Sequence, residues 1–112
     1  MSDKAVISYE EFSKMDLRIG KIVKAEPVPQ SRNLIKLSID VGKGEIKQGV
    51  AGIAKIYASN ELEGRQVAVL NNLQPRRIFG ILSNVMILAA EDEATISMLV
   101  PERPVKVGSQ IK

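Results

Sequence analysis

The chain has 112 residues, the size of one domain, and 45% of them are hydrophobic while only 4% are aromatic, so its core must be aliphatic. It contains no cysteine and no histidine, which excludes disulfides, thiolate metal sites and histidine-based catalysis. The net charge of +3 is uneven, because nine Lys and Arg stand against four Asp and Glu between residues 14 and 55. This pattern indicates an acidic or polyanionic partner or, equally well, a solvated charged surface.

The N-terminal segment predicts a short helix. Ser8 and Glu11 have the spacing of a capping box, which favours a helix over residues 8–15. A helix this short is not stable alone, so we expect Phe12 and Met15 to dock on another surface. The chain start lacks the apolar run of a signal peptide, and no stretch reaches the roughly 18 apolar residues of a membrane span. We therefore expect a cytoplasmic protein without membrane insertion.

Short β-like segments follow along the chain. Gly20 interrupts the first, as at a bulge or a barrel bend, and residues 53–57 predict one or two helical turns between the third and fourth. The expected strands are 17–24, 35–41, 45–50, 66–70 and 82–90, with a hairpin turn at 42–44 and further β-like segments at 95–100 and 105–111. Five short strands with a helical break in that position are typical of the OB-fold barrel. We therefore predict a mainly all-β fold that forms a single domain over residues 1–112.

A rigid basic corner precedes the expected fifth strand. Pro75 fixes its own backbone and pushes Gln74 toward extended geometry, so Arg76 and Arg77 leave a stiff turn. The planar guanidinium suits phosphate or carboxylate, and a stiff base lowers the entropy lost on binding. The alternative is that the pair only solvates a turn.

The apolar residues after this corner indicate an interface. Ile78, Phe79, Ile81 and Leu82 are too many for one barrel strand to bury, because Gly80 breaks their alternation. Exposed apolar surface of this kind usually marks a contact. We therefore expect a symmetric dimer that carries two basic patches.

Catalysis is not expected. The chain has no glycine-rich nucleotide-binding motif, and its serines have no histidine to activate them. The acidic run Glu91, Asp92 and Glu93 could hold a hard cation, although a solvated loop explains it more simply. We predict no catalytic residue, no metal and no cofactor. With so few aromatics for base stacking, any nucleic acid should be bound through phosphate and backbone shape.

Several motifs, taken in order, resemble one family. They are DLRIGKI (16–22), VAGIAK (50–55), NLQPRR (72–77), MILAA (86–90) and PER (101–103). The chain resembles the tRNA-binding domain at the C-terminus of bacterial methionyl-tRNA synthetases, which also occurs as free dimeric tRNA-binding proteins and as the export-related chaperone CsaA. The resemblance covers residues 8–112. It implies an OB-fold whose N- and C-terminal extensions build a homodimer, with Phe12, Ile78, Phe79 and Ile81 at the interface.

The motifs divide between two branches of this family. Residues 28–34, VPQSRNL, lack the His and Asp of synthetase-type members, whereas Pro29, Arg32 and the strand KLSIDVG (36–42) fit CsaA. Three further segments resemble CsaA: IKQ (46–48), PRRI (75–78) and SNV (83–85). Two others resemble the synthetase-type members: VAGIA (50–54) and MILAA (86–90). On this balance the sequence favours the CsaA branch.

The favoured branch implies a non-enzymatic, homodimeric export chaperone that binds unfolded or signal-bearing preproteins near the subunit boundary. Apolar side chains would line a groove, basic ones its rim, and Ser83 and Asn84 would bond peptide backbone. The expected peptide- or tRNA-binding residues are Lys36, Lys47, Gln48, Arg76, Arg77, Phe79, Ser83, Asn84 and Met86.

Two alternatives stay open. The first is a structure-selective tRNA binder, free or as a β-type subunit of methionyl-tRNA synthetase, in which the same basic residues contact phosphates and Ser83 and Met86 occupy the family's Ser-x-x-Met motif. The second is a dimeric OB module whose basic half serves another protein. In every case a second copy of the chain is an expected partner. The chaperone branch adds preproteins or peptides and the export motor, and the tRNA-binding alternative adds tRNA and a methionyl-tRNA synthetase.

Overall fold

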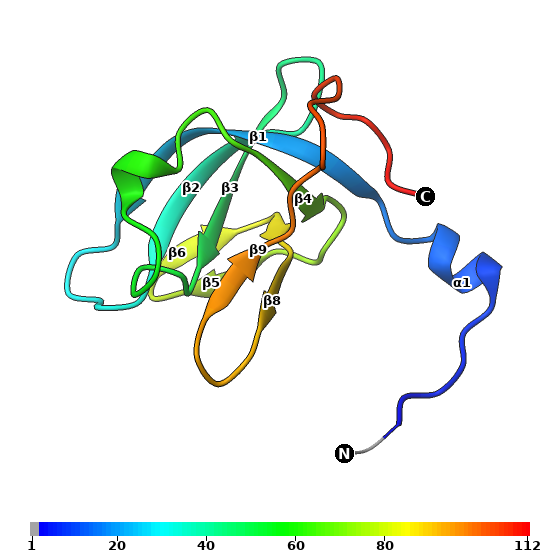
Figure 1. Ribbon diagram of the computed structural model, residues 1–112, viewed down its shortest axis with the longest axis horizontal. Helices are drawn as coiled ribbons and strands as arrows, with labels where there is room; N and C mark the ends of the chain where they lie inside the picture. The colour runs from blue at the N-terminus through cyan, green and yellow to red at the C-terminus, as the bar shows by residue number, and fades with distance from the viewer. Residues whose placement is uncertain (1–2) are drawn as a thin grey trace.

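The strands of the chain form a nearly closed antiparallel barrel (Figure 1), seen in a computed structural model that describes residues 3–112. The elements of this range are α1 (Tyr9–Ser13), β1 (Leu17–Pro27), β2 (Ile35–Asp40), β3 (Ile46–Ala51), the 3₁₀ helix η1 (Ser59–Glu61), β4 (Gln66–Leu70), β5 (Arg76–Ile78), β6 (Ile81–Ser83), β7 (Met86–Ile87), β8 (Ala89–Glu91) and β9 (Ile96–Met98). Five strands make the main sheet in the order β3-β2-β1-β4-β7. The long β1 is the central strand, because it pairs with β2 and with β4. The predicted all-β, OB-type class is confirmed.

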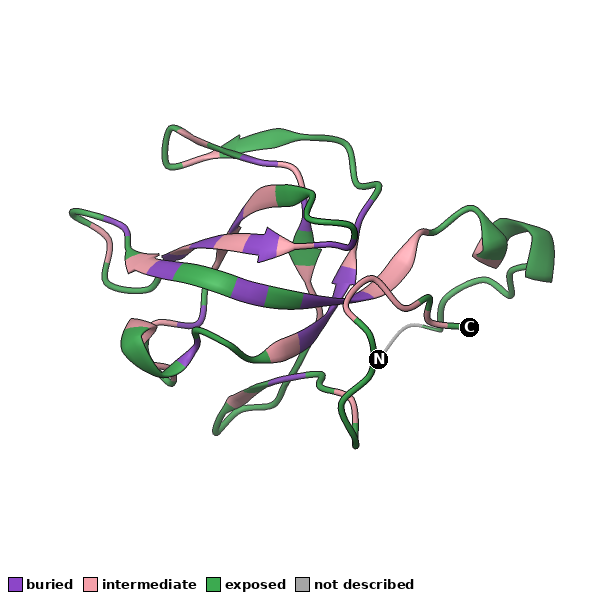
Figure 2. Ribbon diagram, turned by 90° about the horizontal axis from the view of Figure 1, so that it is seen from above, coloured by how far each residue is buried: buried purple, intermediate pink, exposed green. Residues whose placement is uncertain are grey.

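The core fills the inside of this barrel and is aliphatic, as the composition requires. Along β2 the inward residues Ile35, Leu37 and Ile39 are buried, and the residues between them are half-buried. On β4 three consecutive residues are buried, so both faces of this strand are covered. Figure 2 shows the same alternation of buried and exposed positions along the strands. Burial of these side chains is the main stabilisation of the fold.

The expected bulge in β1 lies beyond Gly20. The register with β2 shifts between Ile22 and Lys24. At Gly20 itself a Cβ atom would lie 2.7 Å from Cγ2 of Ile39, so glycine is needed there for close packing of β2 against β1. The prediction of an irregular first strand is therefore right, and its position is wrong.

The helical turn expected at residues 53–57 is present as one turn, and a separate 3₁₀ helix follows it. Ile53 is only 2% exposed and belongs to the core, and the Tyr57 hydroxyl accepts a hydrogen bond from the Met98 N–H at 3.0 Å. These two anchors restrict the segment to a single turn, in which the Tyr57 N–H donates to the Ile53 carbonyl at 2.9 Å. The helix between β3 and β4 is η1, which begins two residues later, at Ser59.

The expected fifth strand over residues 82–90 is wrong as one element, because it is divided into β6, β7 and β8. The β-like segment expected at 105–111 forms no named strand among the described residues, although Gln110 makes an isolated antiparallel bridge with Arg18. The last part of this segment runs beside the start of β1, where the Gly108 N–H donates to the Ile19 carbonyl at 2.7 Å and the Ile111 N–H to the Leu17 carbonyl at 2.8 Å. A positive φ of 92° at Gly108 turns the backbone into this position and prevents a continuous strand.

The N-terminal arm, residues 3–16, has the predicted capping box. The predicted docking of its helix on another surface is not seen within the described chain. Ser8 Oγ accepts from the Glu11 N–H at 3.0 Å, and the Ser8 N–H donates to Glu11 Oε1 at 3.1 Å. Helix α1 nevertheless lies away from the barrel and buries none of its residues (Figure 1). Phe12 meets only Tyr9 as an aromatic neighbour within the described range, with ring centroids 6.3 Å apart. No helix in residues 3–112 is long and apolar enough to cross a membrane.

Candidate functional site

The predicted basic corner is a β-hairpin formed by β5 and β6. Arg76 pairs with Ser83 and Arg77 with Leu82 across this hairpin, directly after Pro75. Both arginine side chains are exposed, and Arg77 Nη1 donates to the Gly80 carbonyl at 3.3 Å. The arginines therefore project into solvent from a paired backbone, as the sequence predicts for a stiff base.

The tip of this hairpin holds a bulky residue in an unusual backbone conformation. Phe79 and Gly80 form the turn with φ values of 55° and 80°, the pattern of a type I′ turn. Positive φ is costly for a large side chain, and Phe79 is 59% exposed, so burial does not compensate the strain within one chain. Strain retained on an exposed aromatic is a feature of interaction sites.

A groove of about 540 Å³ runs beside the hairpin. Its lining is mainly apolar with an arginine at the rim: Val50, Leu73, Gln74, Pro75, Arg76, Ile78, Ser83 and Met86. Lys36 pairs with Val50 across β2 and β3, so its side chain lies on the same face beside this lining. We call these residues the hairpin groove. It can accept a ligand that has both apolar and anionic parts.

Three of the predicted polar site residues close the barrel. The Asn84 N–H donates to the Gln48 carbonyl at 2.9 Å, Asn84 Oδ1 accepts from the Gln48 N–H at 3.2 Å, and Gln48 Nε2 donates to the Leu82 carbonyl at 2.7 Å. Ser83 is buried, and its hydroxyl accepts from the Val50 N–H at 3.2 Å. These groups therefore already have partners within the chain.

The structure does not place Lys47 with the hairpin residues. Its ammonium donates to the Asn71 carbonyl at 2.9 Å. The residues expected at a dimer interface are also divided, because Ile78, Phe79 and Ile81 share the hairpin while Phe12 lies on α1, away from it (Figure 1). Among the predicted binding residues, Lys36, Arg76, Ser83 and Met86 border the hairpin groove, with Phe79 at the hairpin tip.

Sequence reasoning missed a polar cluster at the start of β1. Arg18 Nε and Nη2 donate to the two carboxylate oxygens of Asp16 at 2.9 and 2.8 Å, and Arg18 Nη1 donates to the Val41 carbonyl at 2.8 Å. This pairing lowers the pKa of Asp16 and raises the pKa of Arg18. Asn71 Nδ2 also donates to Asp16 at 2.9 Å. The one signal in the sequence is the DLRIGK motif, which does not reveal these partners.

The acidic run at residues 91–93 is a turn. Asp92 Oδ1 accepts from the N–H groups of Ala94 and Thr95 at 2.8 and 2.9 Å, which lowers the pKa of Asp92. Across the described part of the chain no three His, Cys, Asp or Glu side chains are grouped as metal ligands would be. These hydrogen bonds fit the simpler of the two interpretations, a turn between β8 and β9.

Comparison with known proteins identifies the family. The family model described as "Putative tRNA binding domain" matches residues 17–110. The chain belongs to the tRNA-binding domain family. A methionine–tRNA ligase from Methanoculleus marisnigri is 53% identical over 107 residues, which are 96% of this chain and 16% of the ligase. The chain therefore spans about a sixth of the length of the curated relatives it matches.

Two solved structures share the whole barrel and its extensions. A MetRS related protein from Pyrococcus horikoshii is 31% identical, with a TM-score of 0.89 over 97% of this chain and 100% of that one. The chaperone CsaA from Bacillus anthracis is 35% identical, with a TM-score of 0.87 over 96% of this chain and 100% of that one. The tRNA-binding family, suggested by the motifs, is thus confirmed. Sequence similarity to the ligases exceeds that to CsaA, so it favours the tRNA-binding alternative over the export chaperone.

Proposed function

We propose that this chain is a non-catalytic, cytoplasmic tRNA-binding module that works with a methionyl-tRNA synthetase, either as a part of it or as a separate subunit. The support is the family match and the 53% identity to a methionine–tRNA ligase over nearly the whole chain. This function is the one that the sequence placed second. It agrees with the uneven basic charge, since phosphate contacts dominate the affinity of most nucleic-acid binders.

One observation of the structure carries this proposal: Arg76 and Arg77 are both exposed, on opposite faces of a paired hairpin. Neither takes part in an ion pair with another described residue. Exposed guanidinium groups that have no ion-pair partner suit phosphates of an RNA backbone. Lys36, beside the hairpin groove, would add a third cationic contact, and Phe79 at the tip would touch sugar or an unpaired base.

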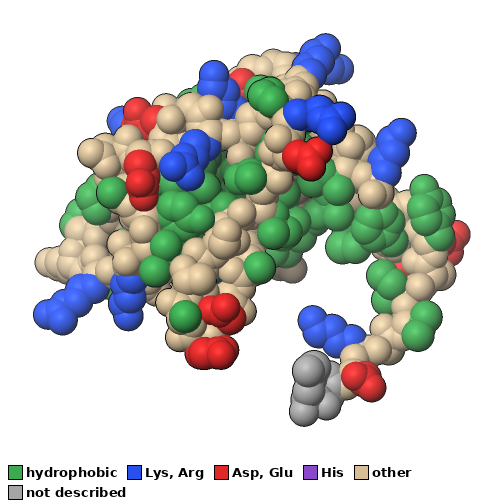
Figure 3. All heavy atoms as spheres, in the orientation of Figure 1, with side chains coloured by type: hydrophobic (Ala, Val, Ile, Leu, Met, Phe, Trp, Pro, Cys, Tyr) green, Lys and Arg blue, Asp and Glu red, His purple; other side chains and the backbone are tan. Residues whose placement is uncertain are grey.

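We further propose that two copies associate through the N-terminal arm. Tyr9 is 83% exposed, Met15 is exposed, and no residue of α1 is buried. Figure 3 shows hydrophobic side chains on the part of the barrel that faces this arm, with a hollow between the two. A second copy placed there would cover both apolar surfaces and would double the number of basic hairpins.

Peptide binding is the second candidate function. The similarity to the CsaA chaperone and the apolar floor of the hairpin groove favour it. In that case the groove would hold apolar side chains of an unfolded preprotein, and the arginines would contact its backbone carbonyls or acidic residues.

Salt dependence separates the two functions. The chain is titrated with total tRNA and with a signal-bearing polypeptide at two salt concentrations. If tRNA is the ligand, log K against log salt falls with a slope of roughly −0.7 to −0.9 per phosphate contact. Apolar capture of a peptide depends little on salt. Tight peptide binding without salt-sensitive tRNA binding would refute the tRNA proposal and support the second candidate.

A further inference from the structure

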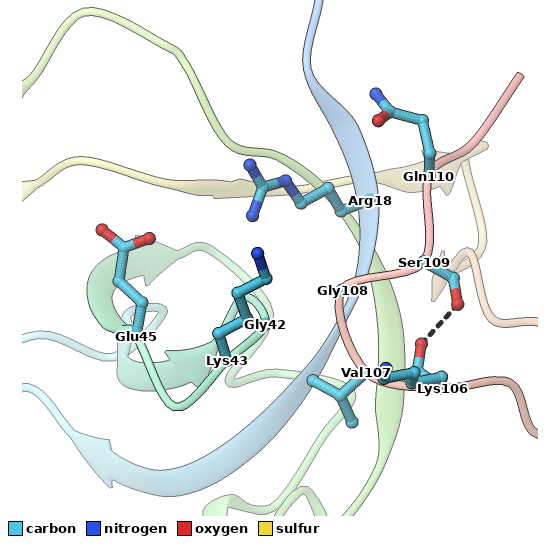
Figure 4. Close-up of a pocket in the computed structure, with 9 residues that line it drawn as sticks. All are labelled: Arg18, Gly42, Lys43, Glu45, Lys106, Val107, Gly108, Ser109 and Gln110. Atoms are coloured by element: carbon cyan, nitrogen blue, oxygen red, sulfur yellow. Dashed lines mark hydrogen bonds between the residues drawn. The ribbon is translucent and has the colours of Figure 1, made fainter.

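A second cavity of about 690 Å³ lies between the turn that joins β2 to β3 and the C-terminal segment (Figure 4). Its lining includes Arg18, Lys43, Glu45, Lys106 and Gln110. We call it the C-terminal cavity. In Figure 1 this turn and the C-terminal segment lie at the opposite side of the barrel from the β5–β6 hairpin, so the cavity is separate from the hairpin groove.

Two glycines hold the walls of this cavity together. A Cβ atom on Gly108 would lie 2.8 Å from the Cα of Gly42, and one on Gly42 would lie 3.0 Å from the Cα of Gly108. Both have positive φ, 120° for Gly42 and 92° for Gly108. The two backbones therefore touch where any other residue would separate them. This approach fixes the distance between segments that are far apart in the sequence.

The floor of the cavity is an immobilised guanidinium. Arg18 Nε and Nη2 each donate one N–H to Asp16, and Nη1 donates one N–H to the Val41 carbonyl. Two of its five N–H groups have no partner among the described residues. Because the side chain is already fixed, little entropy is lost when these donors bind an oxyanion.

Two lysines add charge that nothing in the described chain neutralises. Lys43 and Lys106 take part in no ion pair within residues 3–112. Lys43 points toward the Arg18 guanidinium in Figure 4, and Arg18 is itself paired with Asp16. Glu45 is the one carboxylate in the lining, and no ion pair joins it to either lysine among the described residues. An anion bound in the cavity would be attracted by the two lysines, which have no ion-pair partner in the described part of the chain.

We propose that the C-terminal cavity binds a phosphate group, either of a polynucleotide backbone or of a free phosphate ester. Arg18 would donate its two free N–H groups to the phosphate oxygens, and Lys43 and Lys106 would supply the charge. For a polynucleotide the inference rests on the proposed tRNA binding and adds a binding point across the barrel from the hairpin groove. For a free phosphate ester it does not depend on that function.

The test combines two probes with charge-changing variants of the full chain. Inorganic phosphate is titrated while the amide NMR signals of Lys43, Gly108 and Ser109 are followed, and total tRNA is titrated at several salt concentrations. The variants are Lys43→Asn, Lys106→Ala and Glu45→Gln. Asparagine tolerates the φ of 56° at position 43, so the turn is kept while the charge is removed. Lys24→Ala, an exposed lysine of β1 beside Glu26, is the matched single-charge control.

Phosphate should shift these amides in the wild type. Its affinity should fall several-fold in Lys43→Asn and Lys106→Ala, rise several-fold in Glu45→Gln and stay unchanged in Lys24→Ala. With tRNA, the salt slope of Lys43→Asn should be smaller by roughly 0.7 to 0.9 than that of Lys24→Ala.

Three other results are informative. If phosphate does not move these amides and the tRNA salt slope of Lys43→Asn equals that of Lys24→Ala, the cavity is no phosphate site and the inference is overturned. If the wild type binds tRNA and Lys43→Asn behaves like Lys24→Ala, the polynucleotide site is overturned while the proposed function stands. If phosphate follows the expected pattern and tRNA does not bind at all, the site is supported for free phosphate esters and the proposed function fails.

Discussion

The buried hydroxyl of Ser83 accepts a hydrogen bond from the Val50 N–H at 3.2 Å and donates one to the Val85 carbonyl at 3.3 Å. This one side chain thus joins β3 to the segment between β6 and β7, where no backbone ladder continues. The approach is close, because a Cβ atom on Gly49 would lie 2.7 Å from the Val85 carbonyl oxygen. Barrel closure here therefore uses separate hydrogen bonds, those of this serine among them, rather than a continuous ladder.

Replacing this serine tests its role. Ser83→Ala leaves the N–H of the half-buried Val50 without its acceptor, so the free energy of unfolding should fall by about 1 kcal/mol. Urea unfolding measures the decrease, with the exposed Ser97→Ala as the control. If Ser83→Ala keeps its stability but no longer binds tRNA or peptide, the serine contacts the ligand and closure has another cause.

The Asp16–Arg18 pair predicts a specific acid sensitivity. Hydrogen bonds from Arg18 hold the pKa of Asp16 below its ordinary value, so as the pH falls the unfolded chain takes up this proton first. The stabilisation is complete above the unfolded-state pKa of roughly 3.9 and is lost as the pH falls through the lower folded-state pKa. We expect the free energy of unfolding to fall with acid more steeply in the wild type than in Asp16→Asn. Urea midpoints at neutral and acidic pH measure this difference, and equal acid dependence would contradict it.

The strained hairpin tip predicts a stabilising substitution. Phe79→Asn places the residue preferred before glycine in a type I′ turn at a φ of 55°, so the chain should gain about 1 kcal/mol of stability. Thermal unfolding measures the gain. Phe79→Leu, which keeps the strain and removes the ring, is the control. If Phe79 contacts the ligand, both variants should bind tRNA more weakly, and a less stable Phe79→Asn would show that the ring supports the fold.

The parts of the fold that the sequence predicts are those set by local patterns. The alternation in residues 35–41 gives β2, the capping box gives α1, and the apolar run at 66–70 gives β4 with both faces covered. Pro75 and the two arginines likewise predict a stiff basic corner, which the structure forms as a hairpin. In each case neighbours in the sequence determine the conformation.

The errors concern interactions between residues that are distant in the sequence. The fifth strand is divided because Ser83 and Asn84 bond to β3, more than thirty residues away, and no local periodicity records that interaction. The C-terminal cavity was missed for the same reason, since Arg18, Lys43 and Lys106 meet only after the barrel closes. The hydrogen bond from the Gln48 amide to a backbone carbonyl of the hairpin is a further long-range contact that no local pattern predicts.

The unburied arm predicts an oligomeric state. If α1 docks on a second copy, sedimentation equilibrium should give a mass about twice that of the 12.3 kDa chain. Phe12→Glu places a charge in the proposed apolar interface and should reduce the mass to that of one chain with the circular dichroism unchanged. Ser13→Glu adds the same charge to the neighbouring residue as a control. A wild type that stays a single chain at micromolar concentration would refute the proposed dimer.

The arginine hairpin gives the most direct test of the tRNA proposal. Both guanidinium groups are exposed, and the one side-chain hydrogen bond described for the pair joins Arg77 to the Gly80 carbonyl, so Arg76→Ala/Arg77→Ala should fold normally. Its affinity for tRNA should fall, and its salt slope should decrease by roughly 0.7 to 0.9 for each phosphate that the variant no longer binds. Arg76→Lys/Arg77→Lys keeps the two positive charges but removes the planar guanidinium groups. Bidentate phosphate binding by the arginines would be indicated if this variant has the salt slope of the wild type and a tRNA affinity between those of the wild type and the double alanine variant.

An arginine elsewhere on the surface supplies the control for this double variant. Arg103→Ala removes an exposed guanidinium that pairs with Glu102 at 2.9 Å, far along the chain from the hairpin. Because that charge is already partnered, its removal should leave tRNA affinity and the salt slope close to those of the wild type. Equal tRNA binding by the double alanine variant and Arg103→Ala would show that the hairpin does not touch RNA. A double variant that is no longer soluble would show instead that the two arginines serve the fold.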